Sequence, residues 1–323
     1  LDTTEEVIEE ALKLGCNLIV SHHPIIFKGL KKLTGSNYVQ RTVLKSIRNN
    51  IAIYTIHTNL DNVSGGVNDK ICQQLGLIDT EILLPKSGTL SKLVTFIPKQ
   101  NAEKVLKSLF NSGVGEIGEY DHCSFTIDGI GTFRPGQDAS PIVGKAGKNE
   151  TVHESRVEVI FPSYLWPKVK RSLINAHPYD EAAYYLTGLD NDNNQVGSGM
   201  VGNLPTPMDP AEFLSFVKER MDTPLIRHTE PPKGRKVEKI AVCGGSGSFL
   251  IPSAVGSGAD VFITGDVKYH EFFDADGKIM IADIGHYESE AFTKDLLHDL
   301  LTKKFNTFAL HLSKTVTNPI NYF

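Results

Sequence analysis

CNLIVSHHPIIFKGL, residues 16–30, contains a short apolar run that leads into Ser21 and two adjacent histidines, His22 and His23. A continuous apolar run of this length is typical of a strand buried on both faces in a parallel sheet. A helix is predicted just before it, because Thr3 and Glu6 form a capping box ahead of a periodic stretch that Gly15 ends. The two histidines therefore lie at the carboxyl end of a predicted strand.

A second strand of the same kind follows in IAIYTIHTNLD, residues 51–61, after a helix predicted over residues 38–50. This strand ends in His57, Asn59 and Asp61. Strand, helix and strand in this order form a βαβ unit. Ligands bind outside the carboxyl ends of the strands in open α/β sheets. The polar residues that follow both predicted strands are therefore candidates for a ligand-binding site.

A third polar cluster follows the predicted strand KIMIADIG, residues 278–285, where His286 and Glu290 open a helix. Residues four apart project from the same face of a helix, so this pair can hold one metal ion. The loop CGGSGS, residues 243–248, also follows a predicted strand and could cradle a phosphate on its N–H groups. It lacks the lysine of a phosphate-binding P-loop, and a tight strand-to-helix connection is the alternative.

The middle of the chain has a different pattern, in which strands and helices follow the order β-α-β-β-α-β between residues 87 and 194. This order is that of a ferredoxin-like module. We therefore predict an α/β fold in two parts, residues 1–86 and 195–323, interrupted by an inserted ferredoxin-like α+β domain, residues 87–194.

Composition narrows the range of partners. The 323 residues carry a net charge of −5, which gives no basic footprint for nucleic acid. Four cysteines lie far apart without CxxC spacing, so neither a disulfide framework nor a thiolate zinc site is indicated, and a reducing, cytoplasmic location is expected. No apolar run approaches the ~18 residues of a membrane span.

The three clusters together offer imidazole and carboxylate ligands without thiolate, the set that Zn, Fe, Mn or Ni bind. Five or six ligands exceed the needs of one ion, and adjacent residues on a strand point to opposite faces, so His22 and His23 suit two different ions. Each cluster also has a structural explanation. The two histidines could belong to a turn, His286 and Glu290 could be a solvated helix-start pair, and His57 could be a core histidine bonded to a carbonyl or a residue beside the ligands.

Four stretches in this order, SHHPIIFKGL, IHTNLDNVSGGVND, ITGDVKYHEFFDA and GHYESE, resemble the NIF-three-like dinuclear metal-centre family, whose members are often named GTP cyclohydrolase I type 2 homologues. The resemblance covers essentially the whole chain. It implies that His22 and His23 serve separate ions, that Asp61 and His286 complete one ion each, and that Glu290 bridges both. It also implies roles near the metal for Asp266 and His270, for which a helix-start pair is the alternative.

Further expectations come from the same resemblance. It implies that the insert is similar to the PII and CutA proteins, that the chains assemble as a hexameric toroid, and that an additional strand and helix precede Leu1. Two divalent ions per chain would lower the pKa of a bound water to about 7. The expected activity is then a metal-dependent hydrolase of the GTP cyclohydrolase type 2 kind, with hydroxide held between the ions by Glu290 and a nucleotide or purine substrate. The alternative is a metal-handling or regulatory module without turnover.

Overall fold

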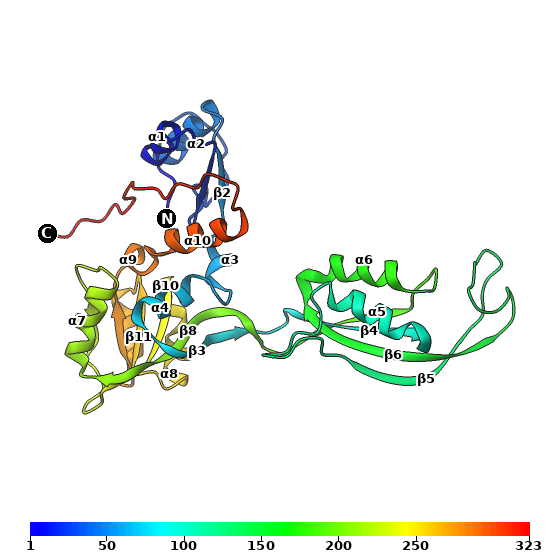
Figure 1. Cartoon of the computed structure of the whole chain (residues 1–323). Coiled ribbons are helices and arrows are strands. Elements are labelled where there is room, and N and C mark those ends of the chain that lie inside the picture. The colour runs from blue at the N-terminus through cyan, green and yellow to red at the C-terminus, as the bar shows by residue number, and fades with distance from the viewer. The chain divides into compact units, whose positions relative to one another are not determined.

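The structure is a computed structural model that describes residues 1–323, and the chain forms two compact units (Figure 1). Unit 1 consists of Leu1–Pro85 and Gln195–Phe323, and unit 2 consists of Lys86–Asn194. Separate clusters of buried apolar residues lie in the two units. No helix of the structure is long and apolar enough to cross a membrane.

Unit 1 contains two sheets. Its smaller sheet consists of β1 (Leu18–Ser21) and β2 (Ala52–Thr55), which are parallel. Its larger sheet has the strand order β3-β8-β10-β11-β12-β9. These six strands are β3 (Ile78–Lys86), β8 (Asn193–Met208), β9 (Arg227–His228), β10 (Val237–Ser246), β11 (Val261–Gly265) and β12 (Met280–Asp283).

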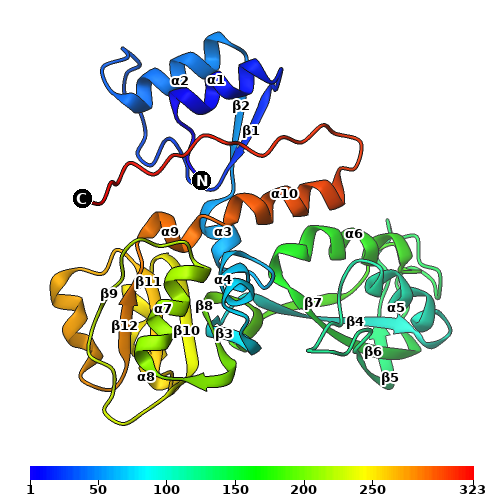
Figure 2. The same ribbon diagram turned by 60° about the vertical axis from the view of Figure 1, so that its left-hand side comes forward.

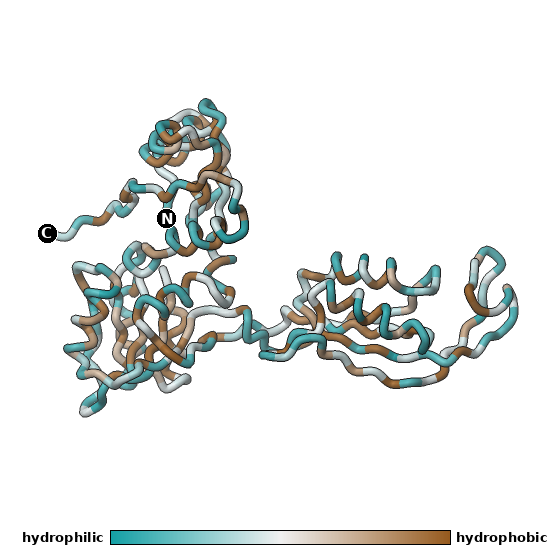
Figure 3. The backbone as a smooth tube through the Cα atoms, viewed as in Figure 1, coloured by the Kyte–Doolittle hydropathy of each residue, from teal (hydrophilic) through white to brown (hydrophobic).

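The strands β10, β11 and β12 are parallel, and continuous apolar sequences such as theirs are typical of buried parallel strands. Strand β8 pairs antiparallel with β10, and β9 pairs antiparallel with β12. Both edges of the three-stranded parallel core are therefore hydrogen-bonded to other strands, and β1 and β2 pair only with each other. The three parallel strands are almost fully buried, and in Figure 3 they lie among the hydrophobic segments of the unit.

The helices of unit 1 cover both sheets. The helix α1 packs on the small sheet through Val7, Ile8 and Ala11, which contact Ile19 and Ile51. Its N-cap is Thr4, whose hydroxyl accepts a hydrogen bond from the Val7 N–H, so the predicted cap at Thr3 is wrong by one residue. The helices are α1 (Glu5–Lys13), α2 (Tyr38–Arg48), α3 (His57–Asp61), α4 (Val67–Leu75), α7 (Pro210–Arg220), α8 (Ile251–Gly256), α9 (His286–Glu290) and α10 (Thr293–Lys304).

Unit 2 is one antiparallel sheet with the strand order β5-β6-β4-β7 and two helices. The helices share a core with the sheet through Val105, Leu109, Val169 and Leu173. The elements are β4 (Leu90–Pro98), α5 (Ala102–Phe110), β5 (Phe125–Phe133), β6 (Glu150–Pro162), α6 (Trp166–Ala176) and β7 (Tyr184–Leu189).

The C-terminal segment, residues 305–323, forms no helix or strand and passes beside the N-terminal part of unit 1 (Figure 2). Glu10 of α1 holds it, because the carboxylate accepts hydrogen bonds from Ser313, from the Lys314 N–H and from Thr315. Burial opposes ionisation of Glu10, but these hydrogen bonds lower its pKa from 4.5 to about 2.

Glu10→Gln is expected to lower the melting temperature at neutral pH, because the amide is a weaker acceptor for the C-terminal segment. A carboxyl group whose pKa is lowered by folding stabilises the native state above its unfolded pKa. The difference between wild type and variant should therefore shrink as the pH falls from about 4.5 to about 2. Thermal melts across this range measure it, and identical melts at neutral pH would contradict the assignment.

Candidate metal centre

The predicted ligands come together in unit 1, where the carboxyl end of β1 meets the carboxyl end of β12. His22 and His23 directly follow β1, and their N–H groups donate to the Leu1 carbonyl. Helix α9 begins at His286 and ends at Glu290, just after β12. Strand β2 ends at Thr55, so Asp61 lies on the short helix α3 and not on the strand that the sequence predicts.

One group of ligand atoms surrounds Oε2 of Glu290. Nε2 of His23 lies 3.0 Å from this oxygen, and Nε2 of His286 lies 3.3 Å from it. The two imidazole nitrogens are 3.2 Å apart. The three atoms thus converge on one small volume.

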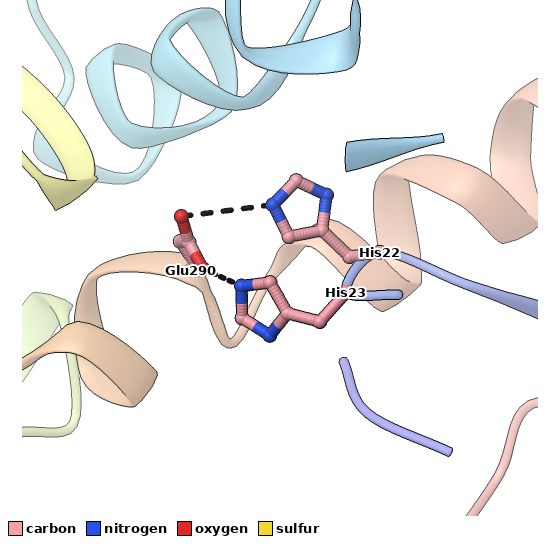
Figure 4. A group of neighbouring side chains, drawn as sticks. All are labelled: His22, His23 and Glu290. Atoms are coloured by element: carbon pink, nitrogen blue, oxygen red, sulfur yellow. Dashed lines mark ion pairs between the residues drawn. The ribbon is translucent and has the colours of Figure 1, made fainter. Parts of the chain in front are cut away.

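A second group surrounds Oε1, the other oxygen of the same carboxylate. Nε2 of His22 lies 3.6 Å from Oε1 of Glu290 and 3.4 Å from Oδ1 of Asp61. Figure 4 shows the Glu290 carboxylate with His22 opposite one oxygen and His23 opposite the other. The single carboxylate therefore faces two separate pairs of ligands.

Several of these atoms are buried without a hydrogen-bond partner. They are both ring nitrogens of His22, Oδ1 of Asp61 and Oε2 of Glu290. A buried polar atom without a partner costs about 1–3 kcal/mol. A cation among these lone pairs would satisfy them, and ligand atoms of His22, His23 and Glu290 all lie within 4.8 Å of one another. The donor set fits a divalent metal.

Two carboxylates outside the cluster fix the histidine rings. Nδ1 of His23 hydrogen-bonds to Asp2 at 2.9 Å, and Nδ1 of His286 hydrogen-bonds to Asp266 at 2.7 Å. An ionised carboxylate only accepts, so each imidazole donates from Nδ1 and keeps the lone pair of Nε2 for the cluster. Carboxylates hold metal-binding histidines in this way. The interpretation of Asp266 as a residue near the ligands therefore agrees with its geometry.

The electrostatics of the cluster favour a cation. Burial would lower the pKa of His23, but Asp2 and Glu290 raise it to about 9. Glu290 and then Asp266 raise the pKa of His286 to about 9 against its burial. Protons on both Nε2 atoms would point at each other across 3.2 Å, so the two rings cannot both be protonated there. A bound cation can replace them, because metal ions compete with protons for such lone pairs.

The two carboxylates of the cluster differ from each other. Burial raises the pKa of Asp61 to about 6, and the nearby Glu290 adds to this shift. Burial also opposes ionisation of Glu290, but His22, His23 and His286 hold its pKa well below the usual range. Glu290 is therefore the ionised group around which the histidines gather.

The glycines at the carboxyl end of β10 make room for the Glu290 carboxylate. A Cβ on Gly245 would lie 2.5 Å from Oε1 of Glu290, and Gly245 has a φ of +62°. Two N–H groups of this stretch are already used, because Gly244 donates to the side chain of Asn68 and Gly245 donates to that of Ser289. These two hydrogen bonds agree with a tight connection and leave no phosphate cradle at Gly244 and Gly245.

Other candidates lie at different distances from the cluster. The His57 ring centroid is 5.6 Å from that of His22 and 5.5 Å from that of His23, and it forms no ion pair with Asp61 or Glu290. It lies beside this cluster of side chains and forms no ion pair within it. The ring of His270 contacts Tyr269 and Phe273. Asp2 and Gly245 were not predicted, because a single aspartate far from the histidines and a glycine in a loop give no ligand spacing.

The fold and the cluster define a mixed α/β protein with a buried histidine–carboxylate group able to hold metal. The family model Duf34/NIF3 (NGG1p interacting factor 3) matches residues 1–319, and the chain belongs to this family. A Bacillus subtilis relative named GTP cyclohydrolase 1 type 2 homolog is 39% identical over 328 residues, covering 100% of this chain and 87% of the relative.

Solved structures agree with this membership. A crystal structure of a Bacillus cereus protein related to NIF3 is similar with a TM-score of 0.85 and 39% identity, covering 100% of this chain and 88% of that one. The crystal structure of a Staphylococcus aureus protein is similar with a TM-score of 0.75 and 30% identity, covering 100% and 87%. The resemblance predicted from the four sequence stretches is confirmed.

Proposed function

We propose that this protein binds two divalent metal ions per chain and is a metal-dependent hydrolase with a nucleotide or purine substrate. Glu290 would bridge the ions, His22 and Asp61 would complete one of them, and His23 and His286 the other. The substrate class rests on the name of the relatives, GTP cyclohydrolase 1 type 2 homolog. Zn, Fe, Mn and Ni all suit the donor set.

One observation carries the proposal, namely that the two oxygens of Glu290 face different ligand pairs. A carboxylate that served one ion would have a single group of nitrogens around it. Here Oε2 lies 3.0 Å from His23 and Oε1 lies 3.6 Å from His22. Glu290 is only 3% exposed, so water cannot stabilise its negative charge and the surrounding histidines have to do so.

The role of the protein chain would be to position the ions and their ligands. Two bound ions supply Lewis-acid activation of water at neutral pH. Asp2 and Asp266 would orient the rings of His23 and His286. Glu290 would set the separation of the ions.

Turnover assays separate the hydrolase from a metal-handling module. The metal-loaded protein is incubated with nucleotide and phosphoester panels, and metal transfer to a chelator is measured in parallel. Turnover that Glu290→Gln abolishes supports the hydrolase. No turnover together with rapid metal exchange would contradict it and favour the module.

We propose in addition that the two units are domains and that unit 2 is an inserted ferredoxin-like domain similar to PII and CutA proteins. The order of its elements and the strand order β5-β6-β4-β7 support this. The family resemblance supports a hexameric toroid, which sedimentation would test. The four unpaired cysteines support a cytoplasmic location.

Deleting residues 88–192 is expected to leave a folded protein that still binds metal. All five proposed ligands lie in unit 1, which has its own buried clusters. Inserted domains tend to have close termini, so a short linker should join the ends. Metal titration of the deletion variant measures this, and loss of binding from a folded variant would show that unit 2 builds the site.

Thr317 of the C-terminal segment is expected to strengthen the binding of one of the two proposed ions. Its hydroxyl donates to Oδ2 of Asp2 at 3.0 Å, and Asp2 holds His23. Loss of a direct outer-shell partner costs 10–100-fold in metal affinity, so Thr317→Val, one bond further out, should cost about 3–10-fold at the His23 site.

Thr315→Val is the matched control in metal titrations, because Thr315 bonds to Glu10 in the same segment and does not touch Asp2. Equal affinities in the two variants would contradict the relay from Thr317 to His23.

A further inference from the structure

Unit 2 contains an open pocket of about 590 Å³ on the side of its sheet away from the helices. Val157 and Val159 of β6 face the core that α5 and α6 share. Because side chains alternate along a strand, Glu154 and Arg156 face the opposite side, where they line the pocket. Figure 3 shows hydrophobic stretches along β5, which forms one wall.

The pocket holds a buried carboxylate with one free oxygen. Glu154 is 9% exposed, and its Oε1 accepts a hydrogen bond from the Tyr179 hydroxyl at 2.9 Å. No group of the protein donates to Oε2. A Cβ on Gly131 would lie 2.0 Å from this oxygen, so the glycine provides the space that the carboxylate occupies.

Neighbouring groups fix this carboxylate in place. The N–H of Tyr179 donates to Nδ1 of His177, whose Nε2 hydrogen-bonds to the Phe96 carbonyl. Burial and Glu154 raise the pKa of Tyr179, so its hydroxyl keeps the proton that it donates. The free oxygen of Glu154 is thus an acceptor that is held in place at the open pocket and meets no donor of the protein.

The remaining charges in the pocket are mostly acidic. Asp128, Asp180 and Glu181 lie along its lining, and Asp128 is paired with Lys99 at 2.6 Å. Arg156 is the one basic residue of the lining, and its guanidinium is bound to Glu158 at 2.9 and 2.8 Å. An anionic ligand would therefore meet repulsion.

The walls are aromatic and aliphatic. Phe96 and Tyr185 form an edge-on pair with ring centroids 5.4 Å apart. Ile127 is 50% exposed and Ile142 is 64% exposed, and both line the pocket. An apolar body can therefore pack here while a polar end reaches the carboxylate.

We propose that this pocket binds a small organic amine, with its protonated amino or guanidino group on Oε2 of Glu154 and its aromatic or branched aliphatic body against Phe96, Tyr185 and Ile127. The site lies wholly within unit 2 and uses none of the proposed metal ligands. It is therefore a second binding function, independent of the metal centre.

Calorimetric titration of the full chain with tryptamine, against indole-3-propionate as its anionic counterpart, tests the proposal. The amine should bind with a Kd below about 1 mM and the acid at least about ten-fold more weakly. Glu154→Gln keeps the shape and the hydrogen bond from Tyr179 but removes the charge, so amine binding should fall at least about ten-fold. Glu119→Gln, an exposed change outside the lining, should bind as wild type.

A second pair of variants tests the same site in case the Glu154→Gln variant does not fold. Gly131→Ala should displace the carboxylate and weaken the amine to a similar extent. Gly188→Ala, on β7 with open space around it, should not. No saturable amine binding by the wild type, equal binding of the acid, or wild-type affinity in Glu154→Gln or Gly131→Ala would overturn the proposal.

Discussion

Glu290→Gln is expected to lose both metal ions, with affinity falling by more than about 100-fold at each site. The loss of an outer-shell partner alone costs 10–100-fold, and a bridging ligand should cost more. The amide nitrogen cannot serve as a ligand to the second ion, and the negative charge between the histidines disappears. Metal titration followed by elemental analysis measures the number of ions and their affinities.

The matched variants for Glu290→Gln are His22→Ala and His23→Ala. Each should damage chiefly one ion, because His22 lies near Oε1 of Glu290 and His23 near Oε2. A role for Glu290 in the helix macrodipole, worth about 0.3–1 kcal/mol at a helix start, does not fit, because Glu290 ends α9. Two ions bound with wild-type affinity in Glu290→Gln would exclude the bridge.

Gly245→Ala is expected to have the second largest effect. The new Cβ would lie 2.5 Å from Oε1 of Glu290, so either the loop or the carboxylate has to move. The φ of +62° adds a backbone cost of roughly 1–2 kcal/mol for any residue with a Cβ. Metal affinity should fall by about 10–100-fold, the range for residues that orient ligands.

Gly258→Ala separates the two causes. Gly258 has a φ of +75°, so it carries a similar backbone cost, but nothing lies within 4 Å of its added Cβ. It should lower the melting temperature and leave the metal affinity unchanged. Equal metal affinity in the two variants would mean that Gly245 acts through backbone conformation alone.

The sequence indicated which residues meet in the candidate cluster because each follows an apolar segment that ends abruptly in polar residues. His22 and His23 after β1, and His286 after β12, are read directly from this change in composition. The spacing of His286 and Glu290 also predicted a shared helix face, and their side chains lie 3.3 Å apart. The division of His22 and His23 between the two sides of Glu290 was implied by the family resemblance, whereas the geometry itself depends on how two sheets face each other.

The sheet arrangement itself was beyond the sequence pattern. Strand β8 is long but contains glycine, asparagine and proline, so its composition is that of a loop. Its pairing with β10 closes one side of the parallel core. Strand β8 was not predicted from the sequence, and neither was the pairing of β1 and β2 in a sheet of their own.

The residues that orient the histidine rings were even harder to predict from the sequence than the sheet arrangement. Asp2 reaches His23 across twenty-one positions of sequence, and only the fold brings them to 2.9 Å. Asp266 was noticed for its spacing to His270, whereas its contact is with His286. Such contacts follow from tertiary structure and not from local periodicity.

The most direct test of the metal centre is anomalous diffraction from crystals of the metal-loaded full chain. The proposal predicts two peaks roughly 3.5–4 Å apart, the usual separation in two-metal sites. One peak should lie beside His22 and Asp61, the other beside His23 and His286, with Glu290 between them. A single peak at full occupancy, or two peaks that do not share Glu290, would contradict the bridged centre.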